Sequence, residues 1–160
     1  MFSFEAWWQI LTTKLPVFFQ GVGTTVELAL YTAIFGTLLG IVVALLRMSR
    51  VKVLKVLAGA YIEFLRGTPL LVQVLIVFYG LPQLGIKLPR MTAGTVALVI
   101  NSAAYMAEIV RSGIQAIDGG QTEASRSLGM NGVQTMVYII LPQAIKNILP
   151  AIGNEFVSII

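Results

Sequence analysis

Long apolar runs separated by short polar segments dominate the chain. Four of them approach or exceed the roughly 20 residues that an α-helix needs to cross a bilayer core of about 30 Å. They cover about residues 21–46, 56–81, 93–113 and 141–160. The pattern predicts an all-α, polytopic membrane protein, with its transmembrane domain in residues 21–160.

Composition agrees with this fold class. Only 11% of the residues are charged and 57% are hydrophobic, whereas soluble domains carry about 25% charged residues. Most of the surface must therefore face lipid or other apolar protein. The net charge of +4 does not indicate a nucleic-acid partner, because the basic residues lie between the apolar runs and not on one solvated face.

The residue types present also argue against an enzyme. The chain has no His and no Cys, and Asp118 is its only Asp. These absences exclude a Ser/His hydrolase, a His- or Cys-bound zinc site and an aspartyl dyad. We therefore expect neither a catalytic residue nor a metal site.

Basic residues predict the orientation in the membrane. Positive charge is retained on the cytoplasmic side, and four basic residues without an intervening acid follow the first run: Arg47, Arg50, Lys52 and Lys55. The N-terminus is then outside. Residues 1–20 mix aromatic and charged side chains, which indicates an external or interfacial segment, either an amphipathic helix or an irregular leader.

Several features inside the runs predict how the helices bend and pack. Gly67-Thr68-Pro69 interrupts the second run and predicts a bend or break. Gly36 and Gly40 have the spacing that lets two helices pack closely. Glu63 with Arg66, and Glu108 with Arg111, stand three residues apart, and we expect each pair to neutralise itself.

A polar, glycine-rich segment at about residues 114–138 carries a spaced motif. Glu123-Ala124-Ser125 is followed by three residues, Gly129, nine residues, and Ile139-Ile140-Leu141-Pro142. We expect a short helix at about residues 121–130. Gly119-Gly120 would end the preceding helix, Thr122 would cap the new one with Glu123 in its first turn, and Gly129 would end it.

This motif resembles the EAA loop of bacterial ABC importer permeases, with Ser125 in place of the second alanine. Residues 61–73 and 101–117 are similar to sequences typical of the polar amino acid permeases of the histidine, glutamine and arginine type. The resemblance covers residues 21–160. It implies the transmembrane fold of type I ABC importers, with four of an expected five spans visible. Because the chain stops within an apolar run at Ile160, we expect the natural protein to continue.

The resemblance also implies function and partners. The short helix would be a coupling helix held in a groove of an ATPase, with Glu123, Ala124, Ser125, Gly129, Leu141 and Pro142 as ATPase-coupling residues. The expected partners are a dimer of ABC ATPases, a second permease chain (identical or related), a periplasmic or lipid-anchored amino acid binding protein, the amino acid itself and membrane lipid. ATP and Mg would bind the ATPase, since this chain has no Gly-x-x-x-x-Gly-Lys-Ser/Thr loop. The location would be the bacterial cytoplasmic membrane.

Helical rise predicts a candidate substrate site. Thr68, Asn101 and Glu155 each lie roughly 18–20 Å from the cytoplasmic end of their spans, near the level at which transporters commonly bind substrate. We expect the break at Gly67 and Thr68 to contact a carboxylate, and Asn101, Tyr105 and Glu155 to contact the rest of an amino acid. The alternative is that these polar groups pair with one another, or with a neighbouring subunit, to hold the spans together.

A different function class remains open at this point. Composition is equally compatible with an ion channel or a passive assembly subunit without ATPase coupling. The motif around Glu123 disfavours the channel hypothesis, because a passive pore does not need an ATPase-docking loop.

Overall fold

The computed structural model of the chain describes residues 4–159. Every regular element within that range is helical, as predicted. In chain order the elements are α1 (Phe4–Arg47), α2 (Lys52–Gly67), α3 (Leu70–Leu75), the π-helical segment η1 (Ile76–Gly80), α4 (Leu81–Gln83), α5 (Arg90–Gln115), α6 (Gly119–Ser127), α7 (Gly132–Gln134), the π-helical segment η2 (Thr135–Ile140) and α8 (Leu141–Ile159).

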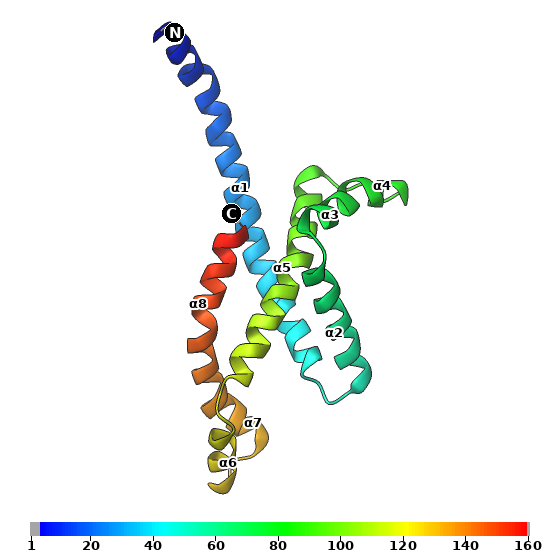
Figure 1. Cartoon of the computed structure of the whole chain (residues 1–160), viewed down its shortest axis with the longest axis vertical. Helices are drawn as coiled ribbons and strands as arrows, with labels where there is room; N and C mark the ends of the chain where they lie inside the picture. Colours follow the sequence, from blue (N-terminus) through cyan, green and yellow to red (C-terminus); the bar gives the residue numbers. More distant parts are fainter. Residues whose placement is uncertain (1–3, 160) are drawn as a thin grey trace.

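Three stretches of the described chain are long and apolar enough to cross a membrane. They are Trp7–Arg47, Arg90–Gln115 and Gly132–Ile159. A fourth candidate is the pair Lys52–Gly67 and Leu70–Gln83, which is bent by 105° at its break. The bend predicted at Gly67-Thr68-Pro69 is therefore confirmed, and Figure 1 shows α3 and α4 turning away from the direction of α2.

Helix α1 is much longer than a membrane is thick. Its 44 residues span roughly 66 Å, about twice the hydrocarbon core. Figure 1 shows its N-terminal half extending beyond the other helices. For residues 4–20 the irregular-leader alternative is thus wrong, because the backbone stays helical through Pro16 into the first span.

Small residues bring α1 and α5 into close contact, as the spacing of Gly36 and Gly40 predicted. A Cβ at Gly36 would lie 3.0 Å from Ser102 Oγ, and one at Gly40 would lie 2.6 Å from Met106 Cβ and 3.0 Å from the Ala103 carbonyl oxygen. Ala44, Ala103, Ala104 and Ala107 are fully buried. Without a hydrophobic driving force between helices in lipid, such close backbone packing stabilises the bundle.

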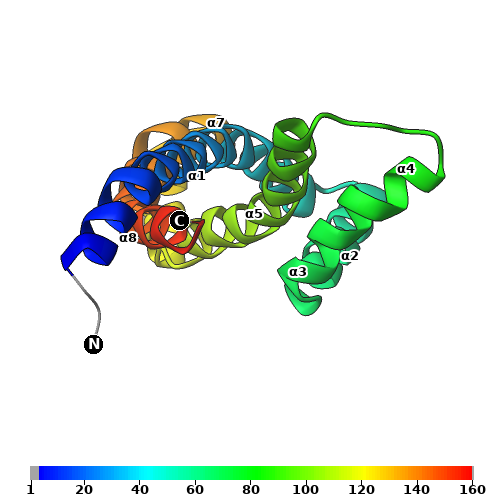
Figure 2. The same ribbon diagram turned by 90° about the horizontal axis from the view of Figure 1, so that it is seen from above.

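Polar contacts fix α2 against its neighbours. Arg47 extends from the end of α1, donates to the Lys55 carbonyl at 3.1 Å and pairs with Glu63 at 3.4 Å. Tyr61 Oη donates to the Ile100 carbonyl of α5 at 2.6 Å. Seen from above in Figure 2, α1, α5 and α8 gather on one side, with α2, α3 and α4 on the other.

Both π-helical segments precede a Leu-Pro-Gln sequence. Leu81 N–H donates to the Ile76 carbonyl and Leu141 N–H to the Met136 carbonyl, each five residues back. A proline has no N–H and its ring clashes with the carbonyl four residues before it, and the wider turn accommodates both effects. The last span therefore starts at Gly132, earlier than the predicted position near residue 141, because Pro142 does not begin the helix.

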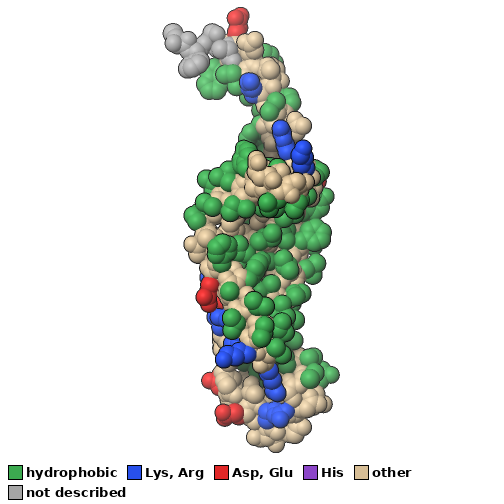
Figure 3. All heavy atoms as spheres, turned by 90° about the vertical axis from the view of Figure 1, so that its right-hand side faces the viewer, with side chains coloured by type: hydrophobic (Ala, Val, Ile, Leu, Met, Phe, Trp, Pro, Cys, Tyr) green, Lys and Arg blue, Asp and Glu red, His purple; other side chains and the backbone are tan. Residues whose placement is uncertain are grey.

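The surface has the distribution expected of a membrane protein. Figure 3 shows a broad band of hydrophobic side chains across the middle of one face of the molecule, with most charged side chains above or below it. Many large apolar side chains of the described residues are exposed, among them Leu38, Leu45 and Leu71. Figure 1 shows α6 and the N-terminal part of α1 at opposite ends of the molecule.

Candidate functional site

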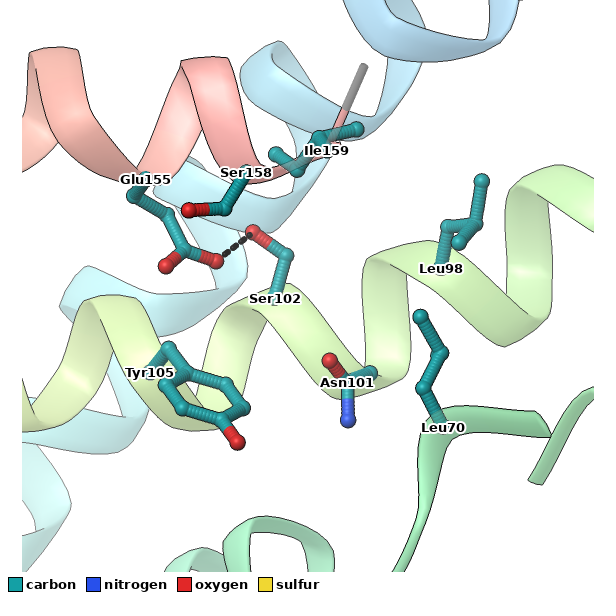
Figure 4. Close-up of a pocket in the computed structure, with 8 residues that line it drawn as sticks. All are labelled: Leu70, Leu98, Asn101, Ser102, Tyr105, Glu155, Ser158 and Ile159. Atoms are coloured by element: carbon teal, nitrogen blue, oxygen red, sulfur yellow. Dashed lines mark hydrogen bonds between the residues drawn. The ribbon is translucent and has the colours of Figure 1, made fainter. Parts of the chain in front are cut away.

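A cavity of about 340 Å³ opens where α3, α5 and α8 meet. This volume falls within the range of about 300–1,000 Å³ that is usual for small-molecule sites. Three of the predicted substrate residues line it together: Asn101, Tyr105 and Glu155. The complete lining, drawn in Figure 4, is Leu70, Leu98, Asn101, Ser102, Tyr105, Glu155, Ser158 and Ile159.

The cavity wall is polar where α5 faces α8. Ser102 Oγ donates to Glu155 Oε1 at 3.3 Å, and Figure 4 shows this carboxylate directed toward Ser102. Tyr105 presents its ring to the same space, and the Arg66 guanidinium carbon lies 5.3 Å from the centre of that ring. A carboxylate within a membrane span is costly and generally marks a pathway or ligand site.

Gln73 is a residue of this region that the sequence analysis missed. Its side chain is buried in α3, and its Nε2 donates to the Leu65 carbonyl at 2.9 Å and to Thr68 Oγ1 at 2.8 Å. Asn101 Nδ2 donates to Gln73 Oε1 at 3.1 Å. The available signal was a single glutamine in the apolar stretch after Pro69, shortly after a break that leaves carbonyls unpaired.

Not every predicted residue takes its expected place. Gly67 and Thr68 do not line the cavity, although Thr68 is joined to Asn101 through Gln73. The expected pair of Glu63 with Arg66 is wrong, because Glu63 pairs with Arg47, which extends from α1, and Arg66 lies over Tyr105. The other expected pair is confirmed: Arg111 Nε donates to Glu108 Oε2 at 2.9 Å.

The predicted short helix is present as α6, but it starts earlier than expected. Asp118, not Thr122, is the N-cap, and its Oδ1 accepts from the Gly120 N–H at 2.7 Å. The two glycines therefore form the first turn of α6 and do not terminate the preceding helix. At the other end Gly129 has a φ of 85°, and the Met130 and Gly129 N–H groups donate to the Ser125 and Arg126 carbonyls. This is a Schellman motif, as expected for glycine at this position.

Helix α6 is attached to the start of the last span through Ser125. This side chain is 4% exposed, and its hydroxyl lies 3.0 Å from Thr135 Oγ1 of η2. The expectation that Ser125 faces another protein is therefore wrong. Glu123 and Ala124 are exposed, and Leu128 is 84% exposed, so these residues form the accessible side of α6.

Residues 36–160 match the family described as binding-protein-dependent transport system inner membrane component. The chain belongs to this family. It is a transport permease subunit, and the resemblance to polar amino acid ABC permeases is confirmed by the relatives that follow.

Curated relatives of this permease come from the same group of transporters. The probable amino-acid permease protein YxeN of Bacillus subtilis (strain 168) is 40% identical, over 96% of this chain and 70% of the relative. The arginine transport system permease protein ArtQ of the same organism is 44% identical, over 91% of this chain and 67% of the relative. Its probable glutamine ABC transporter permease protein GlnM is 42% identical, over 94% of this chain and 70% of the relative.

A solved structure has the same fold as this permease. It is titled "Crystal structure of an amino acid ABC transporter with histidines" and matches with a TM-score of 0.90 and 49% sequence identity. The match covers 99% of this permease and 72% of that chain. The all-helical fold of an ABC importer permease, expected from the sequence, is thereby confirmed.

Proposed function

We propose that this permease carries a polar or charged amino acid across the bacterial cytoplasmic membrane, in an importer driven by ATP. The names of its relatives support an amino acid cargo, since they include an arginine and a glutamine permease. The cavity supports it too, because Asn101, Tyr105 and Glu155 present polar groups within a span where apolar side chains are otherwise expected.

The position of α6 is the observation that carries the proposal. Along the chain it lies between α5 and the η2–α8 helix, and those two helices hold Asn101 and Glu155 on facing walls of the cavity. The Ser125–Thr135 contact ties α6 to η2. A force on the accessible side of α6 therefore reaches both walls of the cavity through two short connections.

The mechanism follows from this arrangement. A dimer of ABC ATPases would bind ATP and Mg, close, and displace α6 through Glu123, Ala124 and Leu128. Movement of α8 against α5 would then change which side of the membrane the cavity faces, which is alternating access. The full transporter would contain a second permease chain and an external binding protein that delivers the amino acid, with the N-terminus of this chain outside.

Transport by the assembled complex tests this function. The permease is purified with its ATPase and second permease chain, placed in liposomes and supplied with its binding protein. Glu123→Ala in α6 should reduce ATP-dependent amino acid uptake by about tenfold or more, within the usual range of coupling between sites. Amino acid binding to the complex should not change.

A matched control is Lys52→Ala, which alters an exposed basic residue at the first position of α2, away from α6 along the chain. It should transport as the unaltered complex does. Uptake that proceeds without ATP, or that is indifferent to Glu123→Ala, would instead support a channel or a passive subunit.

A further inference from the structure

Gln73 joins the break in the second span to the cavity. It is 7% exposed, and its side chain reaches three groups of the break: the Leu65 carbonyl at 2.9 Å, the Thr68 carbonyl at 3.2 Å and Thr68 Oγ1 at 2.8 Å. On its other side it meets Asn101 of α5. A buried amide with this many hydrogen-bond partners has a fixed orientation, and Gln73 therefore links the break rigidly to α5.

The chemistry of those partners fixes which way the Gln73 amide points. The carbonyls of Leu65 and Thr68 can only accept hydrogen bonds. Thr68 Oγ1 also acts as an acceptor, because its own proton goes to the Phe64 carbonyl at 2.9 Å. All three neighbours at the break therefore require the NH₂ end of Gln73. Reversing the amide would set its oxygen against three acceptors.

The orientation of the Gln73 amide in turn determines the orientation of the Asn101 amide. Because Gln73 Nε2 donates to the groups at the break, Gln73 Oε1 faces Asn101 and requires a hydrogen-bond donor. Asn101 Nδ2 is that donor, at 3.1 Å. The Asn101 oxygen is then left for the cavity. Figure 4 shows the Asn101 nitrogen turned away from Ser102 and Glu155, with its oxygen on their side.

We propose that Gln73 is a positioning residue that holds Asn101 with its oxygen toward the cavity, so that the site selects a ligand group rich in hydrogen-bond donors. Asn101 Oδ1 and the Glu155 carboxylate then offer acceptors from two helices, which suits an ammonium or guanidinium group. The proposal rests on the proposed function, since it specifies which amino acids the cavity prefers.

Binding to the purified permease–ATPase complex tests the role of Gln73. Titration calorimetry without the binding protein would compare L-arginine, whose guanidinium only donates, with L-glutamine, whose amide can present either end. Gln73→Met keeps the length of the side chain but frees Asn101 to turn. The ratio of arginine to glutamine affinity should fall about tenfold, because bound arginine then leaves Asn101 Nδ2 buried without an acceptor.

Two further variants separate positioning from a general structural effect. In an Asn101→Leu background, Gln73→Met should not change the affinity ratio, because the residue through which it acts is gone. Gln83→Leu, which alters an exposed glutamine of α4, should leave the ratio at its original value. Should the Gln73→Met complex not assemble, Asn101→Leu alone should lower the ratio about tenfold.

Equal loss of arginine and glutamine binding in Gln73→Met would overturn the proposal and leave Gln73 as a brace for the bend. A ratio that still responds to Gln73→Met without Asn101 would overturn it as well. Either result would leave the proposed transport function intact. Failure of the unaltered complex to bind or transport any amino acid would contradict both the role of Gln73 and the proposed transport function.

Discussion

The glycine at position 40 determines how closely α1 can approach α5. A Cβ there would meet Met106 Cβ at 2.6 Å and the Ala103 carbonyl oxygen at 3.0 Å. Neither atom is the end of a flexible side chain, so the clash can be relieved only by moving the helices apart. Gly23 lies in the same helix and has nothing within 4 Å of its Cβ position, which makes it a matched control.

Gly40→Ala should lower the thermal unfolding midpoint of the purified complex, and Gly23→Ala should leave it unchanged or raise it. Both variants gain about 1 kcal/mol of helix propensity, whereas only Gly40→Ala overpacks an interface, at a cost of roughly 1–3 kcal/mol. The difference between the two midpoints thus isolates the packing cost. Equal midpoints would mean that α1 and α5 are less closely packed than described.

Sequence reasoning reached some residues of the site and not others for a physical reason. Asn101 and Glu155 could be placed at one depth because helical rise is regular. The role of Gln73 depends on carbonyls at Leu65 and Thr68 that only the bend brings together. Arg66 was assigned to Glu63 by spacing, but a contact from another helix, Arg47 to Glu63, took precedence.

At the scale of elements, a side-chain cap at the start and a glycine at the end set the limits of α6. The sequence correctly predicted the end of α6 at Gly129. Helices commonly end at a residue with positive φ, which is usually glycine, and Gly129 has this conformation. Its start was misplaced because Gly119-Gly120 suggested a helix end. The carboxylate of Asp118 outweighs their low propensity by accepting from the Gly120 N–H.

Asp118→Ala should therefore destabilise α6 by about 1 kcal/mol, whereas Asp118→Asn should be almost neutral, because asparagine is an equally good N-cap. Hydrogen exchange of the α6 amides in the complex would show faster exchange only in Asp118→Ala. The same variant should transport less amino acid per ATP hydrolysed, since a frayed helix transmits force poorly. Identical exchange in both variants would show that the cap contributes nothing.

At the scale of the whole molecule, α6 and the N-terminal part of α1 lie at opposite ends (Figure 1), and most charged side chains lie above or below a band of hydrophobic ones on the face drawn in Figure 3. The sequence predicted this division from the basic residues after the first run, but it did not predict that α1 continues as one helix to residue 4. Aromatic residues such as Trp7 and Trp8 favoured an interfacial segment distinct from the first span. In the structure the same helix continues through this segment into the span.

This arrangement makes the orientation in the membrane directly measurable. The 160 residues contain no cysteine, so a single introduced cysteine reports its own position. Thr12 and Leu38 both lie on α1, roughly 39 Å apart along the helix, which exceeds the hydrocarbon thickness. In right-side-out vesicles a membrane-impermeant maleimide should label Thr12→Cys and spare Ser127→Cys of α6. Inside-out vesicles should give the reverse. Leu38 is an exposed apolar residue within the predicted first span, so Leu38→Cys should react in neither. Labelling of Ser127→Cys from the outer side would invert the proposed orientation and place α6 out of reach of any ATPase.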